Sequence, residues 1–426
     1  MSVHADHGSP GTQAREGHCD IAIAGGGLVG MSLAVALGGA GISVVLVESK
    51  APGQSNSGYD ARPIALSQSS RRILNTLGVW DDLSDTVTPI RRIHVSDRGH
   101  FGFARLSAEE CGVDALGYVV AASDLGRALQ AALGAMQTVQ FLRPARVDAL
   151  HWDDGTRAQL LIATAGDSPT PALPARVDAR LTVLCDGGHS PLREGFGIAV
   201  KSRDYGQMAV TAMVAARANH DGVAYERFTA AGPLALLPMH GNCCGLVWSM
   251  DADSAAQLVT LDDAAFLAAL TEQFGTRLGG FVSAGPRSAF PLHLASAAEV
   301  VGRRLAIIGN AANHLHPVAG QGLNLGMRDV AVLAEIVGPC ARDGGDPGDA
   351  SLLARYAACR RQDQKRVTGA TDALVRLFSN RFTPLVIARN LGLLAFDLLP
   401  PVKRRFGDHA MGLSGRQSRL ARGLSS

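Results

Sequence analysis

The chain has 426 residues, of which 47% are hydrophobic and 18% are charged, and its formal net charge is +2. This length allows more than one hydrophobic core, because single cores rarely grow beyond about 250–300 residues. The balanced charge argues against a nucleic-acid-binding protein, since that class usually carries a strong basic surplus. No uninterrupted apolar run reaches the ~18 residues that a membrane-spanning helix needs.

Seven scattered cysteines include no C-x-x-C pair, which indicates reduced thiols in a cytoplasmic protein. Residues 1–19 are polar and glycine-rich, so we expect a disordered tail without a signal peptide.

The first motif lies in residues 20–48, DIAIAGGGLVGMSLAVALGGAGISVVLVE. Residues 21–24 predict a buried strand, an apolar helix follows to about residue 37, and residues 44–47 predict a second strand. Gly25, Gly27 and Gly30 occupy the G-x-G-x-x-G positions: we expect a tight turn, close approach to a pyrophosphate, and helix–strand packing, respectively. Glu48, at the end of the second strand, can accept hydrogen bonds from a ribose. The motif therefore predicts a dinucleotide cofactor, NAD or FAD.

The next 150 residues mix helical and strand patterns. Residues 65–77 predict a helix after Arg62, and residues 92–103 predict a hairpin. Strands are expected at residues 138–142 and, in alternating runs, at 147–184. The last of these strands runs into Asp186-Gly187, a small-residue turn with an acidic group. Because ligands lie off the carboxyl ends of strands in such sheets, we expect this turn to lie beside the first motif.

From about residue 205 to 291 the pattern changes to short strands with one helix near residues 262–274, which predicts a second, mixed or antiparallel sheet. Its apolar residues are either core or the wall of an apolar substrate pocket (Phe228, Leu234, Leu236, Leu237, Val247 and Trp248). Two helices are expected near the end, at 352–377 and 383–399, with Pro400-Pro401 stopping the second. That leucine-rich helix and the basic cluster at 403–405 either cover the sheet or touch a membrane surface.

A third motif occupies residues 305–337, LAIIGNAANHLHPVAGQGLNLGMRDVAVLAEIV. An apolar strand at 305–308 leads into a loop with Pro317, Gly320 and Gly322, and a helix begins near 322–324 and ends at Gly338-Pro339. Free N–H groups and the positive end of the helix dipole then face an anion. The loop is not a P-loop, so a reduced flavin is a better guest than a phosphate. The alternative is a tight turn before a core helix.

These motifs resemble, in order, those of the single-component FAD-dependent aromatic hydroxylases: G-x-G-x-x-G with its acidic residue, then D-G-x-x-S-x-x-R at 186–193, then G-N and G-Q-G at 309–322. Further stretches are similar to the branch that hydroxylates 2-polyprenyl-6-methoxyphenol in ubiquinone biosynthesis. They are DARPIAL at 60–66, HVSDRGH at 94–100, ERFT at 226–229 and GPLA at 232–235. The wider family has aspartate where this chain has Asn310, and an asparagine side chain can also bond a ribityl hydroxyl.

The resemblance implies an α/β fold: a Rossmann-like FAD-binding domain, an interleaved mixed or antiparallel substrate-binding sheet, and C-terminal helices. The expected segments are 20–200 and 298–345 for FAD binding, 201–297 for the substrate sheet, and 346–426 for the C-terminal helices and basic tail. The implied FAD-binding residues are Gly25, Gly27, Leu28, Gly30, Glu48, Arg62, Asp186, Gly187, Asn310, Pro317, Gly320, Gln321, Gly322, Leu323 and Asn324.

The implied reaction is hydroxylation of a polyprenylated phenol through a flavin C4a-hydroperoxide, with NAD(P)H as reductant and O2 as co-substrate. A flavin hydroxylase of a small soluble aromatic compound is the alternative, and a flavoprotein scaffold without turnover is a third reading. No side chain stands out as an acid or base. His314 and His316 have no carboxylate or cysteine close in sequence, so no metal site is expected. Implied partners include other ubiquinone-biosynthesis proteins and the periphery of the inner membrane, but no nucleic acid.

Overall fold

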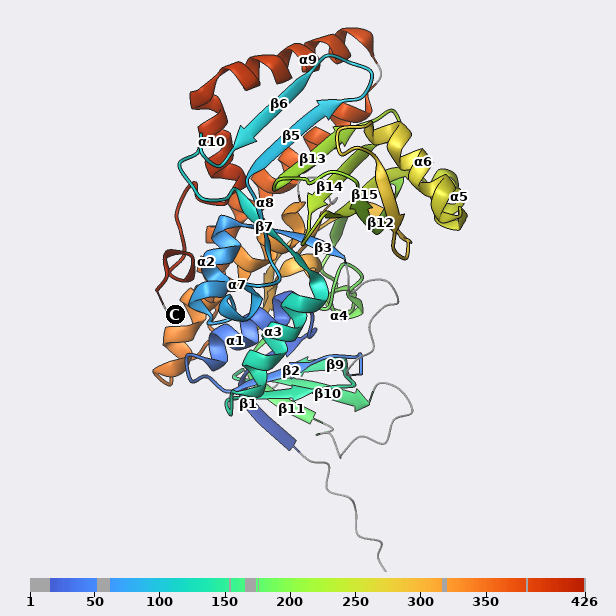
Figure 1. The fold of residues 1–426 in the computed structure, drawn as a ribbon. Coiled ribbons are helices and arrows are strands. Elements are labelled where there is room, and N and C mark those ends of the chain that lie inside the picture. The colour runs from blue at the N-terminus through green and yellow to red at the C-terminus, as the bar shows by residue number, and fades with distance from the viewer. Residues whose placement is uncertain are drawn as a thin grey trace, which may run out of the picture.

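The computed structural model describes residues 16–51, 62–152, 155–164, 174, 176–315, 320–380 and 382–424. Two large sheets dominate the molecule, with a three-stranded sheet packed between them and long helices along one side (Figure 1). The arrangement confirms the expected α/β class.

The first large sheet has the strand order β18-β19-β11-β1-β2-β8, with β9 and β10 attached through β11. Its central strands β19, β11, β1, β2 and β8 are parallel. Their interior residues, such as Ile21 and Leu46, are fully buried because helices cover one face and β9 and β10 contribute to the core of the other. The strands are β1 (Glu16–Ala24), β2 (Val44–Val47), β8 (Val139–Leu142), β9 (Ala145–Trp152), β10 (Ala158–Thr164), β11 (Arg176–Leu184), β18 (Val301–Gly302) and β19 (Leu305–Ile307).

The helices on that face are α1 (Leu28–Gly38), α3 (Ala122–Gly134) and α7 (Gln321–Arg342). They share one core with α2 (Gln68–Thr76) and the start of α8 (Ala350–Ser379). Among the described residues, three helices lie outside this core: the short α4 (Pro191–Gly195), α9 (Thr383–Leu398) and α10 (Pro400–Ala410). Two more, α5 (Ala252–Thr260) and α6 (Asp263–Phe274), cover the second sheet.

The second large sheet has the order β20-β17-β12-β15-β14-β13-β5-β6, with β16 beside β12. Only the β13–β5 pair is parallel, so the sheet is mixed, as expected. Its strands are β5 (Arg92–Asp97), β6 (Phe103–Ser107), β12 (Val200–Ala216), β13 (Val223–Phe228), β14 (Pro233–Pro238), β15 (Cys243–Asp251), β16 (Phe281–Ala284), β17 (Ser288–Ala297) and β20 (Asn313–His314).

The two faces of this sheet have different neighbours. Helices α5 (Ala252–Thr260) and α6 (Asp263–Phe274) cover the outer face. The opposite face, called here the inner face, packs on the three-stranded sheet of β3 (Pro63–Ser67), β7 (Gly117–Ala121) and β4 (Thr88–Ile90). The contact is close: a Cβ on Gly245 of β15 would lie 2.2 Å from the ring of Pro63. The apolar residues named above therefore divide between core positions on the outer face (Leu234, Leu236, Trp248) and inner-face positions (Phe228, Leu237, Val247).

The predicted hairpin at 92–103 is confirmed as β5 and β6, but it pairs with β13 of the second sheet. Residues 20–200 therefore supply strands to both sheets. The division at residues 200 and 297 stays a prediction, with this hairpin and β20 as exceptions to it.

Three predicted boundaries are wrong. Residues 16–19 are strand and not tail, because they pair with β11 and bury Cys19. Residues 63–67 form β3, and α2 begins only at Gln68, because the Ser67 hydroxyl caps it by accepting from Ser70 N. Gly338 and Pro339 lie inside α7, which continues to Arg342 because Val337 and Ala341 are buried in the core.

The predicted end of the helix at Pro400-Pro401 is confirmed, because α9 ends at Leu398, but the further helix α10 was not predicted. Pro400 is the first residue of α10, a position where proline is tolerated because its missing N–H would have no partner in the helix. The basic residues 403–405 are therefore helical. A second helix in the substrate sheet, α5, was also not predicted; the Asp251 side chain caps it by accepting from Ser254 N.

Candidate functional site

The three predicted motifs lie at the carboxyl ends of three neighbouring parallel strands. Strands β1, β11 and β19 occupy adjacent positions of the sheet and end directly before Gly25, Cys185 and Ile308. Main-chain hydrogen bonds join the three ends: Cys185 N donates to Ala24 O at 2.8 Å, and Ile308 N donates to Leu184 O at 3.0 Å. The structure therefore brings together motifs that begin at residues 25, 186 and 309 of the sequence, at the edge where such sheets bind ligands.

The glycines of the first motif are required for different reasons. Gly25 has φ +110°, and a Cβ there would lie 2.5 Å from Cys185 O. A Cβ on Gly30 would lie 1.9 Å from Gly25 O. Both positions therefore need glycine for the fold itself. Gly27, the N-cap of α1, has φ −70° and an added Cβ would meet nothing within 4 Å. Space for a ligand at the helix N-terminus explains glycine there, and this fits a pyrophosphate.

Glu48 lies at the end of β2, as predicted. Its Oε2 accepts from Gly26 N at 2.8 Å and its Oε1 accepts from Lys50 N at 2.9 Å. Ser49 Oγ also donates to Oε1, at 3.3 Å. A carboxylate has about four acceptor positions, so these bonds leave capacity for a ribose hydroxyl. Leu28, the first residue of α1, is half-buried beside this turn.

Asp186 follows β11 and has one buried oxygen, Oδ1, without a hydrogen-bond partner among the described residues. Burial raises the pKa of this carboxyl, while Ser190 and Arg193 act in the opposite direction. Gly187 next to it has φ +98°, a conformation that favours glycine. An unsatisfied buried oxygen beside the other two motifs is what a polar cofactor group would complete.

Arg193 joins the second motif to the third. Its side chain is 3% exposed, and its guanidinium donates to Ala311 O at 2.7 Å and to Gly188 O at 3.0 Å. Asn310 is exposed in the short helix η2 (Gly309–Ala311), where its side chain is accessible to a ligand. Pro317 lies outside the described residues.

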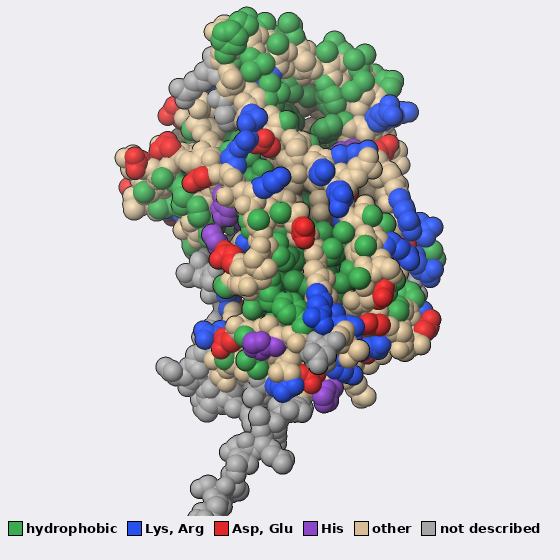
Figure 2. Space-filling view, turned by 180° about the vertical axis from the view of Figure 1, so that it is seen from behind, with side chains coloured by type: hydrophobic (Ala, Val, Ile, Leu, Met, Phe, Trp, Pro, Cys, Tyr) green, Lys and Arg blue, Asp and Glu red, His purple; other side chains and the backbone are tan. Residues whose placement is uncertain are grey.

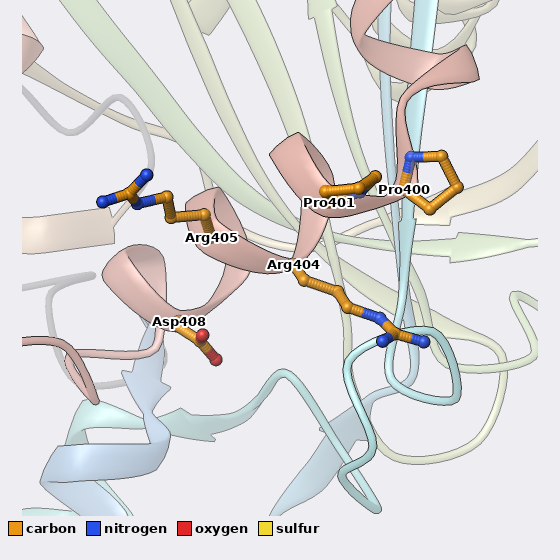
Figure 3. Close-up of a pocket in the computed structure, with 5 residues that line it drawn as sticks. All are labelled: Pro400, Pro401, Arg404, Arg405 and Asp408. Atoms are coloured by element: carbon orange, nitrogen blue, oxygen red, sulfur yellow. The ribbon is translucent and has the colours of Figure 1, made fainter.

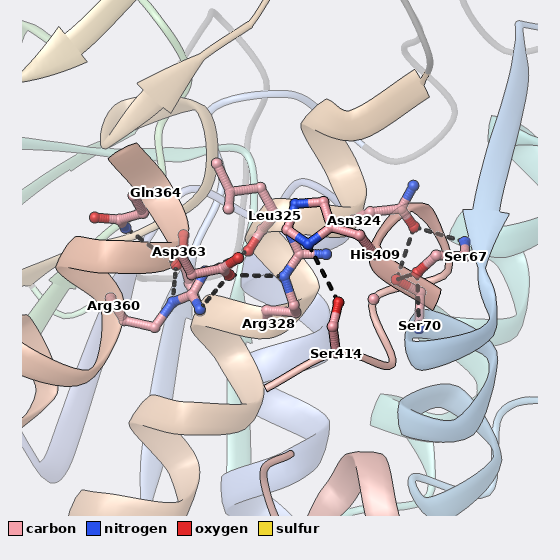
Figure 4. A network of polar contacts seen from close by, with 12 residues as sticks. Ser67, Ser70, Asn324, Leu325, Arg328, Arg360, Asp363, Gln364, His409 and Ser414 are labelled. Carbon is pink, nitrogen blue, oxygen red and sulfur yellow. Dashed lines mark hydrogen bonds and ion pairs between the residues drawn. The ribbon is translucent and has the colours of Figure 1, made fainter. Parts of the chain in front are cut away.

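The start of α7 is fixed to β3 and α2. Asn324 is 2% exposed and its amide uses all four hydrogen-bonding positions: Oδ1 accepts from Ser67 N and Ser70 Oγ, and Nδ2 donates to Ala65 O and Gly320 O (Figure 4). The side chain of Asn324 therefore positions the loop, and only its main chain is left for a cofactor.

The other residues at this helix start differ in their surroundings. Gly320 has φ +59°, and a Cβ there would lie 3.0 Å from Ala65 Cβ. A Cβ on Gly322 would meet nothing within 4 Å, as at Gly27. Gln321 is the first residue of α7, and Leu323 packs on the main core. Arg62 directly precedes β3, and its carbonyl accepts a hydrogen bond from Ala122 N at 3.0 Å.

A row of histidines next to the second and third motifs was not predicted. The rings of His293 and His314 stack at 4.3 Å, and His189 lies 5.4 Å from His293. Burial and the neighbouring histidines lower the pKa of His314 to about 4, so this ring is neutral at pH 7. The sequence did not indicate this row, because the three histidines are widely separated, at positions 189, 293 and 314. Within the described ranges, no group of three or more His, Cys, Asp or Glu residues could hold a metal ion.

Comparison with known proteins identifies the family. The profile of the family described as "FAD binding domain" matches residues 18–371. Ubiquinone hydroxylase UbiL of Rhodospirillum rubrum is 42% identical over 420 residues, which cover 97% of this chain and 95% of the relative. The chain belongs to the FAD-dependent ubiquinone-biosynthesis hydroxylases.

Other comparisons agree with this family. The 3-demethoxyubiquinol 3-hydroxylase of Escherichia coli is 33% identical over 92% of this chain and 98% of the relative. The solved structure of p-nitrophenol 4-monooxygenase PnpA from Pseudomonas putida matches with a TM-score of 0.76, covers 94% of this chain and 100% of that one, and is 20% identical, which shows the shared fold.

As a member of this hydroxylase family, the protein is an FAD-dependent aromatic-ring monooxygenase with NAD(P)H as reductant. Bound FAD supplies the redox chemistry: it takes electrons from the nicotinamide and, with O2, delivers a hydroxyl group. The chain's own contribution is to bind, orient and shield the reactants. The open space at Gly27 and Gly322 and the unpartnered Asp186 oxygen fit the cofactor.

Proposed function

We propose that this hydroxylase acts on a polyprenylated phenol, 2-polyprenyl-6-methoxyphenol, in ubiquinone biosynthesis. The observation that supports this substrate is the composition of the inner face of the second sheet. Its positions on β5, β13, β14 and β15 alternate with outer-face positions and are mostly apolar, and none of them is lysine or arginine (Ile93, Val95, Asp97; Ala224, Glu226, Phe228; Ala235, Leu237; Cys243, Gly245, Val247, Ser249).

The charge on that face favours a neutral, apolar substrate over a soluble aromatic acid. A carboxylate would need an arginine or lysine partner, because burying an unpaired anion is costly. A prenyl chain instead gains about 0.8 kcal/mol for each buried CH2. The identities of 42% and 33% to a ubiquinone hydroxylase and to a 3-demethoxyubiquinol 3-hydroxylase support the same substrate class.

The test is NAD(P)H oxidation coupled to product formation by the FAD-loaded protein. We expect stoichiometric hydroxylation of a short-chain prenylated methoxyphenol and no coupled product from hydroxybenzoates. Coupled product from a hydroxybenzoate, with none from the prenylated phenol, would overturn the proposed substrate in favour of the alternative, a small soluble aromatic compound.

We further infer that the corner formed by α9 and α10 contacts an anionic membrane surface, from which such a substrate would arrive. Of the twelve large hydrophobic residues exposed in the described part of the chain, seven lie between residues 382 and 406 (Phe382, Ile387, Leu391, Leu398, Leu399, Val402 and Phe406). Figure 2 shows hydrophobic side chains gathered across the top of the molecule, where α9 lies in Figure 1. An apolar patch of this kind marks an interaction surface.

The geometry of the two helices favours lying on a membrane over crossing it. No single described helix is long and apolar enough to span a bilayer; α9 and α10 pass that test only together, and they meet at 96°. Exposed Arg404 and Arg405 lie on α10 at a hollow that also includes Pro400, Pro401 and Asp408 (Figure 3). Apolar side chains with adjacent arginines are the combination that binds anionic lipid surfaces.

Co-sedimentation with vesicles tests this surface. We expect the protein to bind vesicles that contain phosphatidylglycerol, and Leu391→Ser with Leu398→Ser to release it. Val282→Ser is the control, because Val282 is 53% exposed but lies on β16, away from this corner. Equal binding by the double variant and the wild type would exclude α9 as the contact.

A further inference from the structure

Glu226 is an ionisable residue in the middle of the second sheet. It lies on β13, where side chains alternate between the two faces. Its neighbour Tyr225 faces outward, with its ring 5.2 Å from that of Phe274 on α6. Phe228, two positions beyond Glu226, stacks at 3.5 Å on Phe378 of α8. Glu226 therefore belongs to the inner face, between Ala224 and Phe228.

The surroundings of Glu226 are apolar. Its cross-strand neighbours are Val95 on β5 and Ala235 on β14, and Val247 on β15 follows next across the sheet. These three side chains and Glu226 are only half-buried, although they occupy central strands. In the described part of the chain, the Glu226 carboxylate makes no hydrogen bond or ion pair. It is thus an unpartnered acid on a face that keeps partial access to solvent.

The other acid on this part of the face does not share that character. Asp97 on β5 is 5% exposed and is held by Arg389 at 2.7 Å, by Asn390 at 3.0 Å and by His100 at 3.3 Å. Its carboxylate is therefore occupied by contacts that hold α9 in place. With only burial acting on it, the pKa of Glu226 rises to about 7, so the group can both accept and return a proton near neutral pH.

One residue, Ala65, contacts both the inner face and the proposed flavin loop. Ala65 of β3 packs in one cluster with Met213 and Leu237 of the inner face. The carbonyl of the same Ala65 accepts from Asn324 Nδ2, which fixes the N-terminus of α7. A substrate ring held on the inner face would therefore be enclosed by the elements that carry the third motif.

We propose that Glu226 is a catalytic base that accepts the proton of the substrate's phenolic hydroxyl; this rests on the proposed function of a phenol hydroxylase. The O–H bond of the phenol breaks, its electron pair stays on the phenol oxygen, and a new O–H bond forms to the Glu226 carboxylate. No electron is gained or lost in this step. The added electron density makes the ring carbons more nucleophilic, so that they react more readily with the hydroxyl group that is transferred.

The variants that test this role keep the shape of the side chain. Glu226→Gln is nearly isosteric and cannot accept the proton, Glu226→Asp keeps the carboxylate, and Tyr225→Phe on the opposite face of the same strand is the matched control. Each is purified with FAD and compared in FAD content, in the rate of flavin reduction by NAD(P)H, and in hydroxylated product formed per NAD(P)H consumed.

We expect Glu226→Gln to retain FAD and the flavin reduction rate but to lower the hydroxylation rate roughly 100-fold, in the range usual for a general base. Glu226→Asp should recover part of it and Tyr225→Phe should match the wild type. The phenolate absorbance of the bound substrate should appear in the wild type, rise with pH around 7, and be absent in Glu226→Gln. Unchanged product yield and phenolate absorbance in Glu226→Gln would overturn the proposal.

The experiments can distinguish failure of the proposed role of Glu226 from failure of the proposed function. If the wild type hydroxylates a simple phenol but no prenylated one, the proposed substrate is wrong and Glu226 is judged with the simple phenol. If the wild type hydroxylates no phenol, both are overturned. If Glu226→Gln loses FAD or folded structure, the pH dependence of bound phenolate absorbance in the wild type decides: a transition near pH 7 supports the base, and its absence contradicts it.

Discussion

The Asp329 carboxylate and the Arg360 guanidinium form a buried ion pair, with 2.6 Å between Asp329 Oδ1 and Arg360 Nε. Asp329 lies on α7 and is 0% exposed, and Arg360 lies on α8 and is 4% exposed. The other carboxylate oxygen of Asp329 accepts from Gly309 N at 3.1 Å. Arg360 also binds Asp363, and Figure 4 shows it beside Asp363 and Gln364. One buried pair thus connects two helices to the start of the third motif.

Removal of one partner of this pair should destabilise the protein strongly. Arg360→Ala leaves the Asp329 carboxylate buried and uncompensated, which costs about 3–5 kcal/mol. Chemical denaturation of the FAD-free protein should show this loss, whereas Arg405→Ala, at an exposed position on α10, should change stability by less than about 0.5 kcal/mol. A loss below about 1 kcal/mol for Arg360→Ala would contradict the role assigned to the pair.

Gly27→Val should abolish FAD binding without harming the fold. The backbone there has φ −70° and an added Cβ meets no protein atom, so only a bound pyrophosphate conflicts with the side chain. The expected result is a colourless protein with the melting temperature of the FAD-free wild type. Gly30→Val is the contrasting variant, because its Cβ would overlap Gly25 O and should reduce stability itself. Full FAD occupancy in Gly27→Val would refute the assignment.

Gly322→Val should impair turnover more than stability. Its Cβ has open space, and the cost of valine in the first turn of a helix is below about 1 kcal/mol. Gly320→Val should reduce both, because φ +59° and the contact with Ala65 disfavour any side chain. The measurements are NAD(P)H oxidation dependent on oxygen and thermal unfolding. Wild-type turnover in Gly322→Val would contradict a flavin contact here and would support the alternative, a tight turn before a core helix.

The stability of the substrate-free enzyme should depend on pH through Glu226. Its folded-state pKa of about 7 lies above the usual 4.5, so the folded protein holds this proton more tightly than the unfolded chain does. The folded state therefore loses stability as pH rises from about 4.5 to 7. Glu226→Gln lacks this loss, and its melting temperature relative to wild type should increase between pH 5 and pH 8. A constant difference across that range would show that Glu226 has an ordinary pKa.

Local patterns were sufficient where one short segment carries the whole signal. The turn at Gly25, the strand before Glu48 and the apolar strand at 305–307 were predicted because glycine spacing and buried runs are local properties. The burial of both faces of the central parallel strands also followed from their unbroken apolar runs. These elements fix the three motifs at one edge of the sheet.

The rest depends on contacts between distant residues. Gly338 and Pro339 stay helical because packing of α7 outweighs their local preference. Asn324 was expected to bind the cofactor, but its amide is used by residues more than 250 positions away. Glu226 was missed because the sequence AYERF does not show what packs against each face of its strand. The available signal was a carboxylate that shares one face of a predicted strand with the apolar residues two positions before and after it, Ala224 and Phe228.

The strand order of the first sheet has a consequence for how the protein is made. Strand β1 lies between β2 and β11. On the other side of β11, β10 pairs with its first residues, and β19, which begins at Leu305, pairs with its last three. During synthesis on the ribosome, the carboxyl end of β11 therefore keeps an open edge until about three quarters of the chain has been translated. Residues 309–322, to which we assign contacts with the flavin, are synthesised only after this point. On this assignment, FAD can be captured only when about three quarters of the chain has been made.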